Sequence, residues 1–221
     1  MISHLSKYHL VHLVSMERRQ LKDMQKVLFE IMEKKHGKGK FSSFPALFEE
    51  WMIDAKTNEE MYNILVEDIA IYEGLSSHFR VLLGDLVRIM FDVRQFAEVM
   101  DLYTGCELLK LIPQDIPRYM MSNYNGNAFN EVSKRFPDLI RQFKDVLVSG
   151  KDGVMKPQRD IYTLAISRWN LNPERVMYID DDLDNIETAK SLGFKTVPYT
   201  TLETAIGLIS SIIEESKRSD D

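Results

Sequence analysis

The stretch that most constrains the fold runs from Arg175 to Phe194 and reads RVMYIDDDLDNIETAKSLGF. Its apolar run 176–179 is typical of a short strand that is buried on both faces. Three aspartates follow directly, and then a helical pattern that ends at Gly193. A carboxylate cluster at the carboxyl end of a buried strand lies where open α/β sheets bind their ligands. The stretch therefore predicts an α/β protein with a functional site at this edge of its sheet.

The acidic run Asp180-Asp181-Asp182 has two explanations, and the sequence leaves both open. The helix macrodipole favours acids at a helix N-terminus, and this effect accounts for one aspartate. Three successive carboxylates repel one another unless a cation neutralises them. A divalent cation is therefore the preferred interpretation.

Composition narrows the class of protein. The 221 residues suffice for one α/β domain with a small inserted module. The net charge of −6 argues against nucleic acid or an anionic membrane as the main partner. No apolar stretch approaches the roughly 20 residues of a membrane span. Cys106 is the only cysteine, and no secretion signal is recognised, so we expect a cytoplasmic protein.

The chain divides into a helical part and an alternating part. Segment 8–15, YHLVHLVS, predicts a short strand, and apolar residues then recur at helical spacing over 17–100. From Thr104 onward strand and helix patterns alternate, which implies parallel pairing with right-handed crossovers. The strands predicted there are 119–121, 146–148, 176–179 and 194–197. We therefore expect a Rossmann-like, mostly parallel α/β core from residues 1–16 and 101–221, with an α-helical cap at 17–100.

Three polar groups follow successive strands of the alternating part. They are Ser122-Asn123, Lys156 and the acidic loop 180–185. Because the carboxyl ends of parallel strands meet at one edge of a sheet, we expect these groups to converge. A hydroxyl and an amide can bind phosphoryl oxygens, an ammonium neutralises their charge, and carboxylates hold a cation. The sequence therefore predicts a crevice for a magnesium-bound phosphate, with a small phosphorylated molecule as ligand.

Three stretches of the chain resemble motifs of the haloacid dehalogenase (HAD) superfamily. They read MSNYNGNAFNEVSKRFPDL, VSGKDGVMKPQRDIY and VMYIDDDLDNIETAKSLGF. The likeness is closest to the phosphatase-like branch that carries a helical cap. It is strong from about Thr104 to Val197 and weak over the cap. The resemblance implies a HAD-like fold and hydrolysis of phosphate esters.

The resemblance also implies roles for individual residues. Ser122 and Lys156 would be the catalytic residues, and together with Asn123 they would bind the phosphate. Asp181 would be the principal metal-binding acid, with Asn185 in the place of a second acid. The predicted metal set is completed by Asp180, and the implied cofactor is Mg²⁺.

The first motif of the family is missing from this chain. The family carries Asp-x-Asp at the end of its first strand, one residue as nucleophile and the other as general acid/base. The corresponding segment here, 10–17, contains no aspartate, and Asp23 lies within the following helix pattern. Without these carboxylates no phosphoaspartate forms and a metal ligand is lost, so weak Mg²⁺ binding is expected. Loss of the proton donor alone typically slows such a reaction about 100- to 10,000-fold.

Three functions stay open at this point. The preferred one is a HAD-like protein that keeps a phosphate and metal crevice, has lost or greatly weakened hydrolysis, and binds a ligand or partner. The second is an active phosphomonoester hydrolase, either with an unconventional nucleophile or with a true start or first motif that differs from this sequence. The third is a structural or interaction protein. The sequence names neither the substrate nor the oligomeric state.

Overall fold

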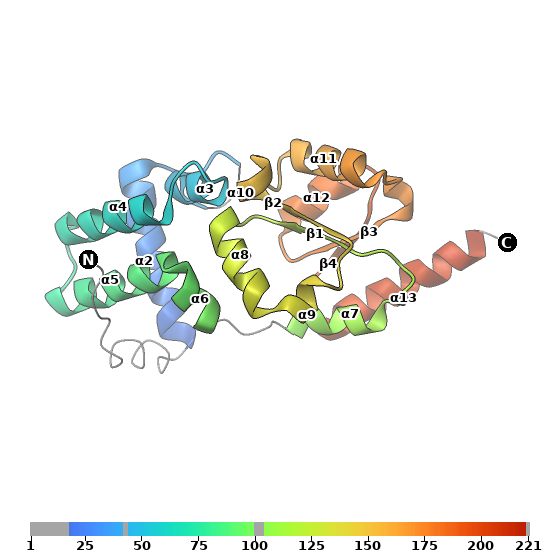
Figure 1. Ribbon diagram of the computed structural model, residues 1–221, viewed down its shortest axis with the longest axis horizontal. Helices are drawn as coiled ribbons and strands as arrows, with labels where there is room; N and C mark the ends of the chain where they lie inside the picture. The colour runs from blue at the N-terminus through green and yellow to red at the C-terminus, as the bar shows by residue number, and fades with distance from the viewer. Residues whose placement is uncertain (1–17, 42–43, 100–103, 220–221) are drawn as a thin grey trace. The chain divides into compact units, whose positions relative to one another are not determined.

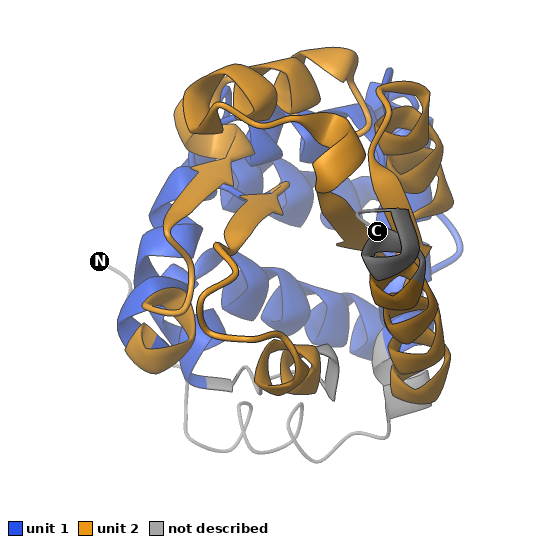
Figure 2. Ribbon diagram, turned by 90° about the vertical axis from the view of Figure 1, so that its right-hand side faces the viewer, with its two compact units in different colours: residues 1–100, 124–136 blue, residues 101–123, 137–221 orange. Residues whose placement is uncertain are grey.

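The computed structural model describes residues 18–41, 44–99 and 104–219 (Figure 1). The strand predicted over 8–15 lies outside the described residues. The chain forms two compact units, which Figure 2 distinguishes by colour. The first contains residues 1–100 and 124–136, and the second contains residues 101–123 and 137–221.

The first unit is helical throughout its described residues. Its helices are α2 (Arg18–His36), α3 (Ala46–Met52), α4 (Asn58–Ile71), α5 (Ser77–Phe91), α6 (Val93–Val99) and α8 (Gly126–Arg135). The Thr-x-x-Glu pattern of Thr57 and Glu60 predicts a capping box, and the structure has it at the start of α4, where the two residues bond each other's backbone N–H groups. Between residues 44 and 99 the described chain contains no strand, only an isolated bridge at Pro45. An all-helical segment was predicted here, and its described residues agree with that.

Aromatic and sulfur-containing side chains fill the interior of this unit. The Trp51 ring lies between those of Phe48, at 5.1 Å, and Phe91, at 5.3 Å, measured between ring centroids. Met32 and Met61 are fully buried. The helical spacing of methionine and aromatic residues in this segment predicts core positions, and these buried side chains agree with that prediction.

Helix α8 belongs to the helical unit although it follows a strand of the other unit in sequence. Asn125 caps α8 by accepting bonds from the backbone N–H groups of Asn127 and Ala128. The amide of Asn125 also donates to the Asp54 carboxylate and to the Trp51 carbonyl. The predicted division into 1–16 with 101–221 and 17–100 differs from the compact units at this helix. That division stays a prediction, because segment 1–16 lies outside the described residues.

The second unit alternates strands and helices, as predicted. It begins with the 3₁₀ turn η1 (Thr104–Glu107), and a second turn, η2 (Pro173–Arg175), precedes its third strand. Its strands are β1 (Tyr119–Ser122), β2 (Asp145–Val148), β3 (Met177–Asp180) and β4 (Lys195–Pro198). Its helices are α7 (Leu108–Leu111), α9 (Pro137–Ile140), α10 (Ser149–Asp152), α11 (Arg159–Trp169), α12 (Leu183–Ser191) and α13 (Leu202–Ser219).

The described strands pair in parallel, in two pairs. Strand β1 pairs with β2 from Tyr119↔Asp145 to Ser122↔Val148. Strand β3 pairs with β4 from Met177↔Lys195 to Asp180↔Pro198. The predicted α/β class with parallel strands is confirmed.

Helices cover both faces of these strands. On one face, α11 and α12 bury Tyr178 of β3 and Leu147 of β2 in a shared core cluster. On the other face, α13 packs against Val197 of β4, with Met177 and Ile179 of β3 at its margin. Successive residues of β3 thus serve opposite faces, which is the period of two expected for a strand.

One predicted cap is shifted by a single residue. The sequence indicated a capping box of Thr200 and Glu203 for the last helix. Helix α13 begins at Leu202, and the hydroxyl of Thr201 accepts the Thr204 N–H at 3.2 Å. Two adjacent threonines offered the same cap, and pattern alone did not separate them.

Candidate functional site

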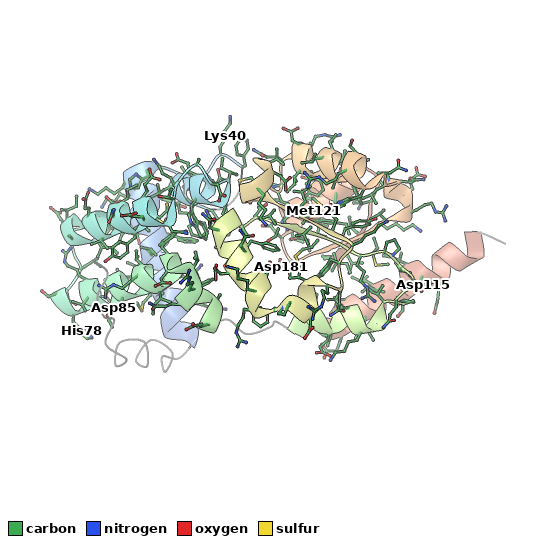
Figure 3. The ribbon with its side chains drawn as sticks, in the orientation of Figure 1. Lys40, His78, Asp85, Asp115, Met121 and Asp181 are labelled. Carbon is green, nitrogen blue, oxygen red and sulfur yellow. The ribbon has the colours of Figure 1, made fainter. Side chains whose placement is uncertain are left out.

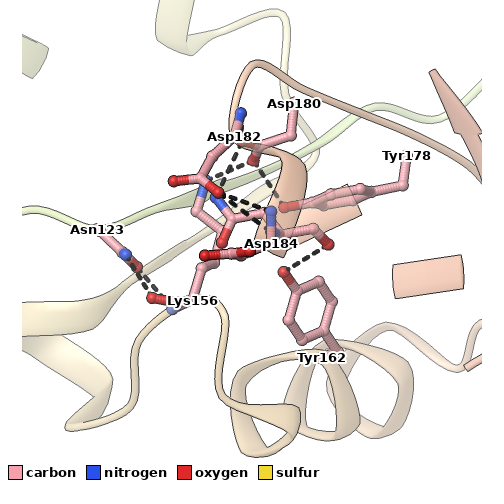
Figure 4. Close-up of polar contacts among 8 residues, drawn as sticks. Asn123, Lys156, Tyr162, Tyr178, Asp180, Asp182 and Asp184 are labelled. Carbon is pink, nitrogen blue, oxygen red and sulfur yellow. Dashed lines mark hydrogen bonds and ion pairs between the residues drawn. The ribbon is translucent and has the colours of Figure 1, made fainter. Parts of the chain in front are cut away.

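The polar residues of the site stand at the carboxyl ends of three strands of the second unit. Ser122 ends β1 and Asn123 follows it, Lys156 lies in the loop between α10 and α11, and Asp180 ends β3. Figure 4 shows the contacts that join most of them. The predicted convergence of strand-end residues is therefore present for Asn123, Lys156 and Asp180.

Asn123 positions Lys156 through two backbone hydrogen bonds. Its Nδ2 donates to the Lys156 carbonyl, and its Oδ1 accepts the Lys156 N–H, both at 2.8 Å. These bonds occupy both polar atoms of the Asn123 amide. Asn123 thus supports the Lys156 backbone, and the phosphate-binding role predicted for Asn123 stays a prediction.

Lys156 and Asp180 form a buried ion pair. The Lys156 Nζ donates to Asp180 Oδ2 at 2.8 Å, and the two side chains are only 13% and 7% exposed. Because both charges have left water, removal of either one would strand its partner. Lys156 is thus held at the strand ends by its backbone and by its ammonium group.

The Asp180 carboxylate accepts four hydrogen bonds. Oδ2 accepts from Lys156 and from the Tyr178 hydroxyl at 2.7 Å. Oδ1 accepts from the Asp182 N–H and from Asn185 Nδ2, both at 3.0 Å. An ionised carboxylate offers about four lone-pair sites, so these partners saturate Asp180.

The same contacts set the pKa of Asp180. Burial by itself would raise that pKa, but the Lys156 charge and the hydrogen bonds from Asn185, Lys156 and Asp182 outweigh it. The net pKa of the carboxyl group lies below its ordinary value. Asp180 is therefore an anion in the folded protein at neutral pH.

Two tyrosines complete the site, and the sequence interpretation had missed both. The Tyr178 hydroxyl donates to Asp180, and the buried Tyr162 donates to the Asn185 carbonyl at 3.0 Å. Burial, with the nearby Asp180 charge, raises the pKa of both phenols, so each stays a donor. Tyr178 stands two residues before Asp180, on the same side of the strand. This spacing of two residues could have indicated from the sequence that Tyr178 lies beside Asp180. No local sequence pattern indicated Tyr162.

The remaining acids of the loop have different surroundings. Asp182 caps α12, because its Oδ1 accepts the N–H groups of Asp184 and Asn185. The helix-terminus explanation therefore holds for this aspartate. Asp181 and Asp184 are exposed.

Asn185 supplies an unused acceptor. The residue is 6% exposed, and its Oδ1 is buried with no hydrogen-bond partner among the described residues. Mg²⁺ prefers carboxylate and amide oxygens, and it commonly keeps several waters. The exposed Asp181 carboxylate and Asn185 Oδ1 are oxygens of this kind, and the metal role predicted for Asp180 stays a prediction like theirs. In the described part of the chain no group of three His, Cys, Asp or Glu side chains could hold a metal ion.

Ser122 has a half-buried position at the end of β1. Within the described ranges its hydroxyl has no protein hydrogen-bond partner, so it can donate to or accept from a ligand. The phosphate role of Ser122 and Lys156 and the metal role of Asp181 and Asn185 stay predictions. The segment 10–17, where the family's first motif belongs, lies outside the described residues.

The fold and this polar cluster define an α/β protein that presents its ligand groups at strand ends. The particular family is given by sequence: the chain belongs to the haloacid dehalogenase-like hydrolases, whose family model matches residues 32–193. The predicted superfamily is thereby confirmed.

Named relatives match only parts of their own length. Acyl-CoA dehydrogenase family member 10 of Mus musculus is 32% identical over 73 residues, 33% of this chain and 7% of that protein. Drimenol cyclase drtB of Aspergillus calidoustus is 25% identical over 143 residues, 65% of this chain and 25% of that protein. Phosphorylated carbohydrates phosphatase of Thermotoga maritima is 36% identical over 61 residues, 26% of this chain and 27% of that protein. This chain thus spans between 7% and 27% of these relatives.

Solved structures share the fold over most of the chain. A predicted HAD-like family hydrolase from Porphyromonas gingivalis has a TM-score of 0.60 and 22% identity, covering 89% of this chain and 90% of that one. A HAD family enzyme from Bacteroides thetaiotaomicron, in complex with magnesium and inorganic phosphate, has a TM-score of 0.56 and 19% identity. It covers 84% of this chain and 87% of that one.

Among the described residues no helix is both long and apolar enough to span a membrane.

Proposed function

We propose that this protein uses the strand-end site of its second unit to bind a phosphorylated small molecule or a partner group of that chemistry, with hydrolysis lost or greatly weakened. One observation carries the proposal. The site holds a fixed lysine and a saturated carboxylate, yet the sequence before Asp23 contains no aspartate to act as nucleophile.

The anion-binding part of the proposal rests on Lys156 and Ser122. Asn123 fixes the backbone of Lys156, and Asp180 fixes its ammonium group. A lysine held in this way needs little further ordering to bind an anion, which lowers the entropic cost of binding. The Ser122 hydroxyl would add a hydrogen bond to a phosphoryl oxygen.

The metal part of the proposal rests on Asp181 and Asn185. The charges of Asp180 and Lys156 offset each other in their ion pair. The exposed Asp181 therefore adds a negative charge that no lysine offsets in that pair, beside the expected phosphate. Asp181 and Asn185 would hold Mg²⁺, whose positive charge would offset that negative charge. With one free carboxylate and one amide oxygen, we expect weak affinity for the ion. The structure of the HAD family enzyme from Bacteroides thetaiotaomicron in complex with magnesium and inorganic phosphate supports the choice of Mg²⁺.

The proposed loss of hydrolysis rests on the two carboxylates that segment 10–17 lacks. Phosphoryl transfer through an aspartate needs a carboxylate nucleophile and a positioned proton donor, and these act as a unit. Segment 10–17 offers neither aspartate. What remains is positioning and electrostatic stabilisation, which support binding more than turnover.

An active phosphomonoester hydrolase is the second candidate function. It is favoured by membership of a hydrolase family and by the 36% identity over 61 residues to the Thermotoga maritima phosphatase. Its nucleophile would be a residue other than a first-strand aspartate, or its true start or first motif would differ from segment 10–17 of this sequence.

Turnover of p-nitrophenyl phosphate, with and without Mg²⁺, separates the candidates. It should be measured together with calorimetric Mg²⁺ binding on the unmodified chain, Asp181→Asn and Asp184→Asn. Asp184→Asn is the matched control, because it removes the same charge from an exposed position three residues away. We expect no turnover, and weak Mg²⁺ binding that disappears in Asp181→Asn alone.

Other outcomes point elsewhere. Robust magnesium-dependent turnover that Asp181→Asn abolishes would overturn the proposal that hydrolysis is lost. It would favour the active phosphomonoester hydrolase. Absence of both turnover and binding would leave a structural or interaction protein. Asp introduced at both His12 and Val14, which restores the Asp-x-Asp spacing, should create magnesium-dependent turnover if the missing carboxylates are the sole defect.

A further inference from the structure

The end of α2 and the loop after it carry a concentration of positive charge. Residues 34–41, here called the basic loop, read KKHGKGKF and contain four lysines, one histidine and no acid, in a chain whose net charge is −6. All four lysines are exposed, and none forms an ion pair in the described part of the chain. Figure 3 shows one of them, Lys40, pointing away from the ribbon. This charge is therefore available to a partner.

Helix stability explains only the first part of this charge. Lys34 and Lys35 lie in the last turn of α2, where the helix macrodipole favours cations. That effect fades beyond the last turn, and α2 is followed by Gly37 in the left-handed region, at a φ of 87°. Lys38 and Lys40 come after this glycine. Neither the helix nor an ion pair among the described residues accounts for them.

Backbone contacts hold the basic loop in a defined conformation. The Gly39 N–H donates to the Phe44 carbonyl at 2.9 Å, and Lys38 forms an isolated antiparallel bridge with Pro45. At the start of the loop, the side chain of His36 bonds the Asp68 carboxylate of α4 at 2.6 Å. A fixed backbone determines where each lysine side chain begins. Less conformational entropy is then lost when the lysines bind a partner.

The buried Glu49 carboxylate anchors the end of the basic loop. It accepts the backbone N–H groups of Lys40, at 2.8 Å, and Phe41, at 3.0 Å. Successive backbone N–H groups of this kind can form an anion site, but here the protein's own carboxylate occupies them. An incoming anion therefore meets the ammonium groups of the lysines. The basic loop offers side-chain charge, and not a backbone cradle for a phosphate.

An exposed aromatic ring stands beside the lysines. Phe41 is 39% exposed, and the Lys40 Nζ lies 5.0 Å from the centroid of its ring. Because Glu49 holds the Phe41 backbone, the ring starts from a fixed position. Aromatic side chains are frequent anchors of protein interfaces, and neighbouring charges select the partner. Together, Phe41 and the lysines suit a partner that presents carboxylates next to an apolar side chain.

We propose that the basic loop is a docking site for an acidic peptide segment of a partner protein, in which carboxylates flank an apolar side chain. Charge complementarity carries the proposal, because four exposed ammonium groups lie within seven consecutive residues and no ion pair within the described chain offsets them. The inference goes beyond the proposed function. It holds whether or not the strand-end site of the second unit binds a ligand.

The charge of the whole chain favours a short peptide over a larger polyanion. Nucleic acid or an anionic membrane would bring a long row of negative charges toward a chain whose own net charge is −6. A short acidic peptide contacts little more than the basic loop. At physiological ionic strength, charges more than about 8 Å away are largely screened, so the rest of the chain repels it weakly.

Fluorescence anisotropy with the full chain tests the proposal. The probe is a labelled peptide of glutamates with one central leucine, and its control carries glutamine in place of glutamate. We expect saturable binding of the glutamate peptide alone, at least about fivefold weaker in Lys38→Glu/Lys40→Glu. The matched control Lys22→Glu/Lys26→Glu reverses two exposed lysines about two helical turns or more before the basic loop, and should change the affinity less than about twofold. Phe41→Ser should weaken binding of this peptide, but not of one with glycine in place of leucine.

Several results would overturn the proposal. No saturable binding of the glutamate peptide, or equal losses in the two double variants, would mean that the basic loop is not a docking site. Tighter binding of a single-stranded oligonucleotide or of phosphatidylserine vesicles, weakened by Lys38→Glu/Lys40→Glu, would assign the loop to nucleic acid or to a membrane. Sedimentation that shows a dimer dependent on the same lysines would assign it to a second copy. Should the charge reversal unfold the chain, as circular dichroism would show, Lys38→Gln/Lys40→Gln takes its place, and an unchanged affinity in that variant would refute the proposal.

Discussion

Glu49 in the first unit and Asp180 in the second are both buried carboxylates, and their partners come from different ranges of the sequence. Glu49 is 6% exposed and accepts the backbone N–H groups of Lys40, at 2.8 Å, and Phe41, at 3.0 Å. Lys40 itself is exposed and points outward (Figure 3). Glu49 therefore holds in place the loop that precedes it in the sequence. These two partners are backbone groups that lie close to Glu49 along the chain.

Asp180 draws its charged partner from 24 residues away. The Lys156 ammonium is itself nearly buried, and Asn123, after yet another strand, fixes the Lys156 backbone. A carboxylate that is satisfied by backbone N–H groups stabilises a loop. A carboxylate that is paired with a buried side-chain charge fixes that charge in a defined place, and this is useful for binding. Both carboxylates are buried, so their exposed fractions do not tell which one stabilises a loop and which one fixes a charge.

The largest expected effect comes from Lys156→Met, which removes the counter-charge of Asp180. A buried carboxylate without its partner typically costs about 3–5 kcal/mol of stability. Urea unfolding should report that loss, and Lys156→Arg, which keeps the charge, should lose much less. Equal losses in the two variants would mean that packing, rather than charge, is what Lys156 contributes.

Tyr178→Phe should have the next largest effect. It removes one of the four hydrogen bonds to the Asp180 carboxylate but keeps the ring, which packs 5.5 Å from the Tyr162 ring. A hydrogen bond to a charged group contributes about 1.5–3 kcal/mol. Tyr72→Phe is the matched control, since its exposed hydroxyl bonds Glu30 and should matter little. A negligible loss in Tyr178→Phe would show that Asp180 is not saturated.

Gly39→Ala addresses the Glu49 side of the comparison. A Cβ at Gly39 would lie 2.2 Å from the Phe44 carbonyl oxygen and 2.5 Å from Glu49 Oε1. Because the nearest atom is backbone, we expect a loss of about 1–3 kcal/mol, measured by thermal unfolding. Gly84→Ala within α5 meets nothing within 4 Å and should stabilise by about 0.5–1 kcal/mol. A tolerated Gly39→Ala would mean that the Glu49 loop adjusts freely.

The smallest expected effect is the change of stability with pH that comes from Asp180. It is isolated by comparing the unmodified chain with Asp180→Asn. The pKa of Asp180 is lowered in the folded protein, so its stabilisation is fully present above the unfolded value of about 3.9. That stabilisation is lost as the pH falls toward the folded pKa. Urea unfolding of the unmodified chain and of Asp180→Asn between pH 7 and 3 should show stabilities that converge below about pH 4. A difference that stays constant over this range would contradict the role of the Asp180 charge.

Local patterns in the sequence determined much of this protein. The capping box of α4 and the change from helices to alternating strands at Thr104 follow from apolar spacing and caps. The family and the three strand-end positions also came from sequence, because motifs and strand ends are contiguous. These features depend on interactions within about one turn or one strand, so nearby residues suffice to specify them.

Tertiary structure alone decided how the acids divide their work. The sequence shows three adjacent aspartates, but only the folded chain turns Asp180 inward to Lys156, makes Asp182 a cap and leaves Asp181 exposed. The folded chain also brings the Tyr162 hydroxyl, from a separate helix, into a hydrogen bond with the Asn185 carbonyl. Such assignments depend on which side of a strand end faces the interior and on which distant loop reaches it. Neither is encoded in spacing along the chain, because both follow from the packing of elements far apart in sequence.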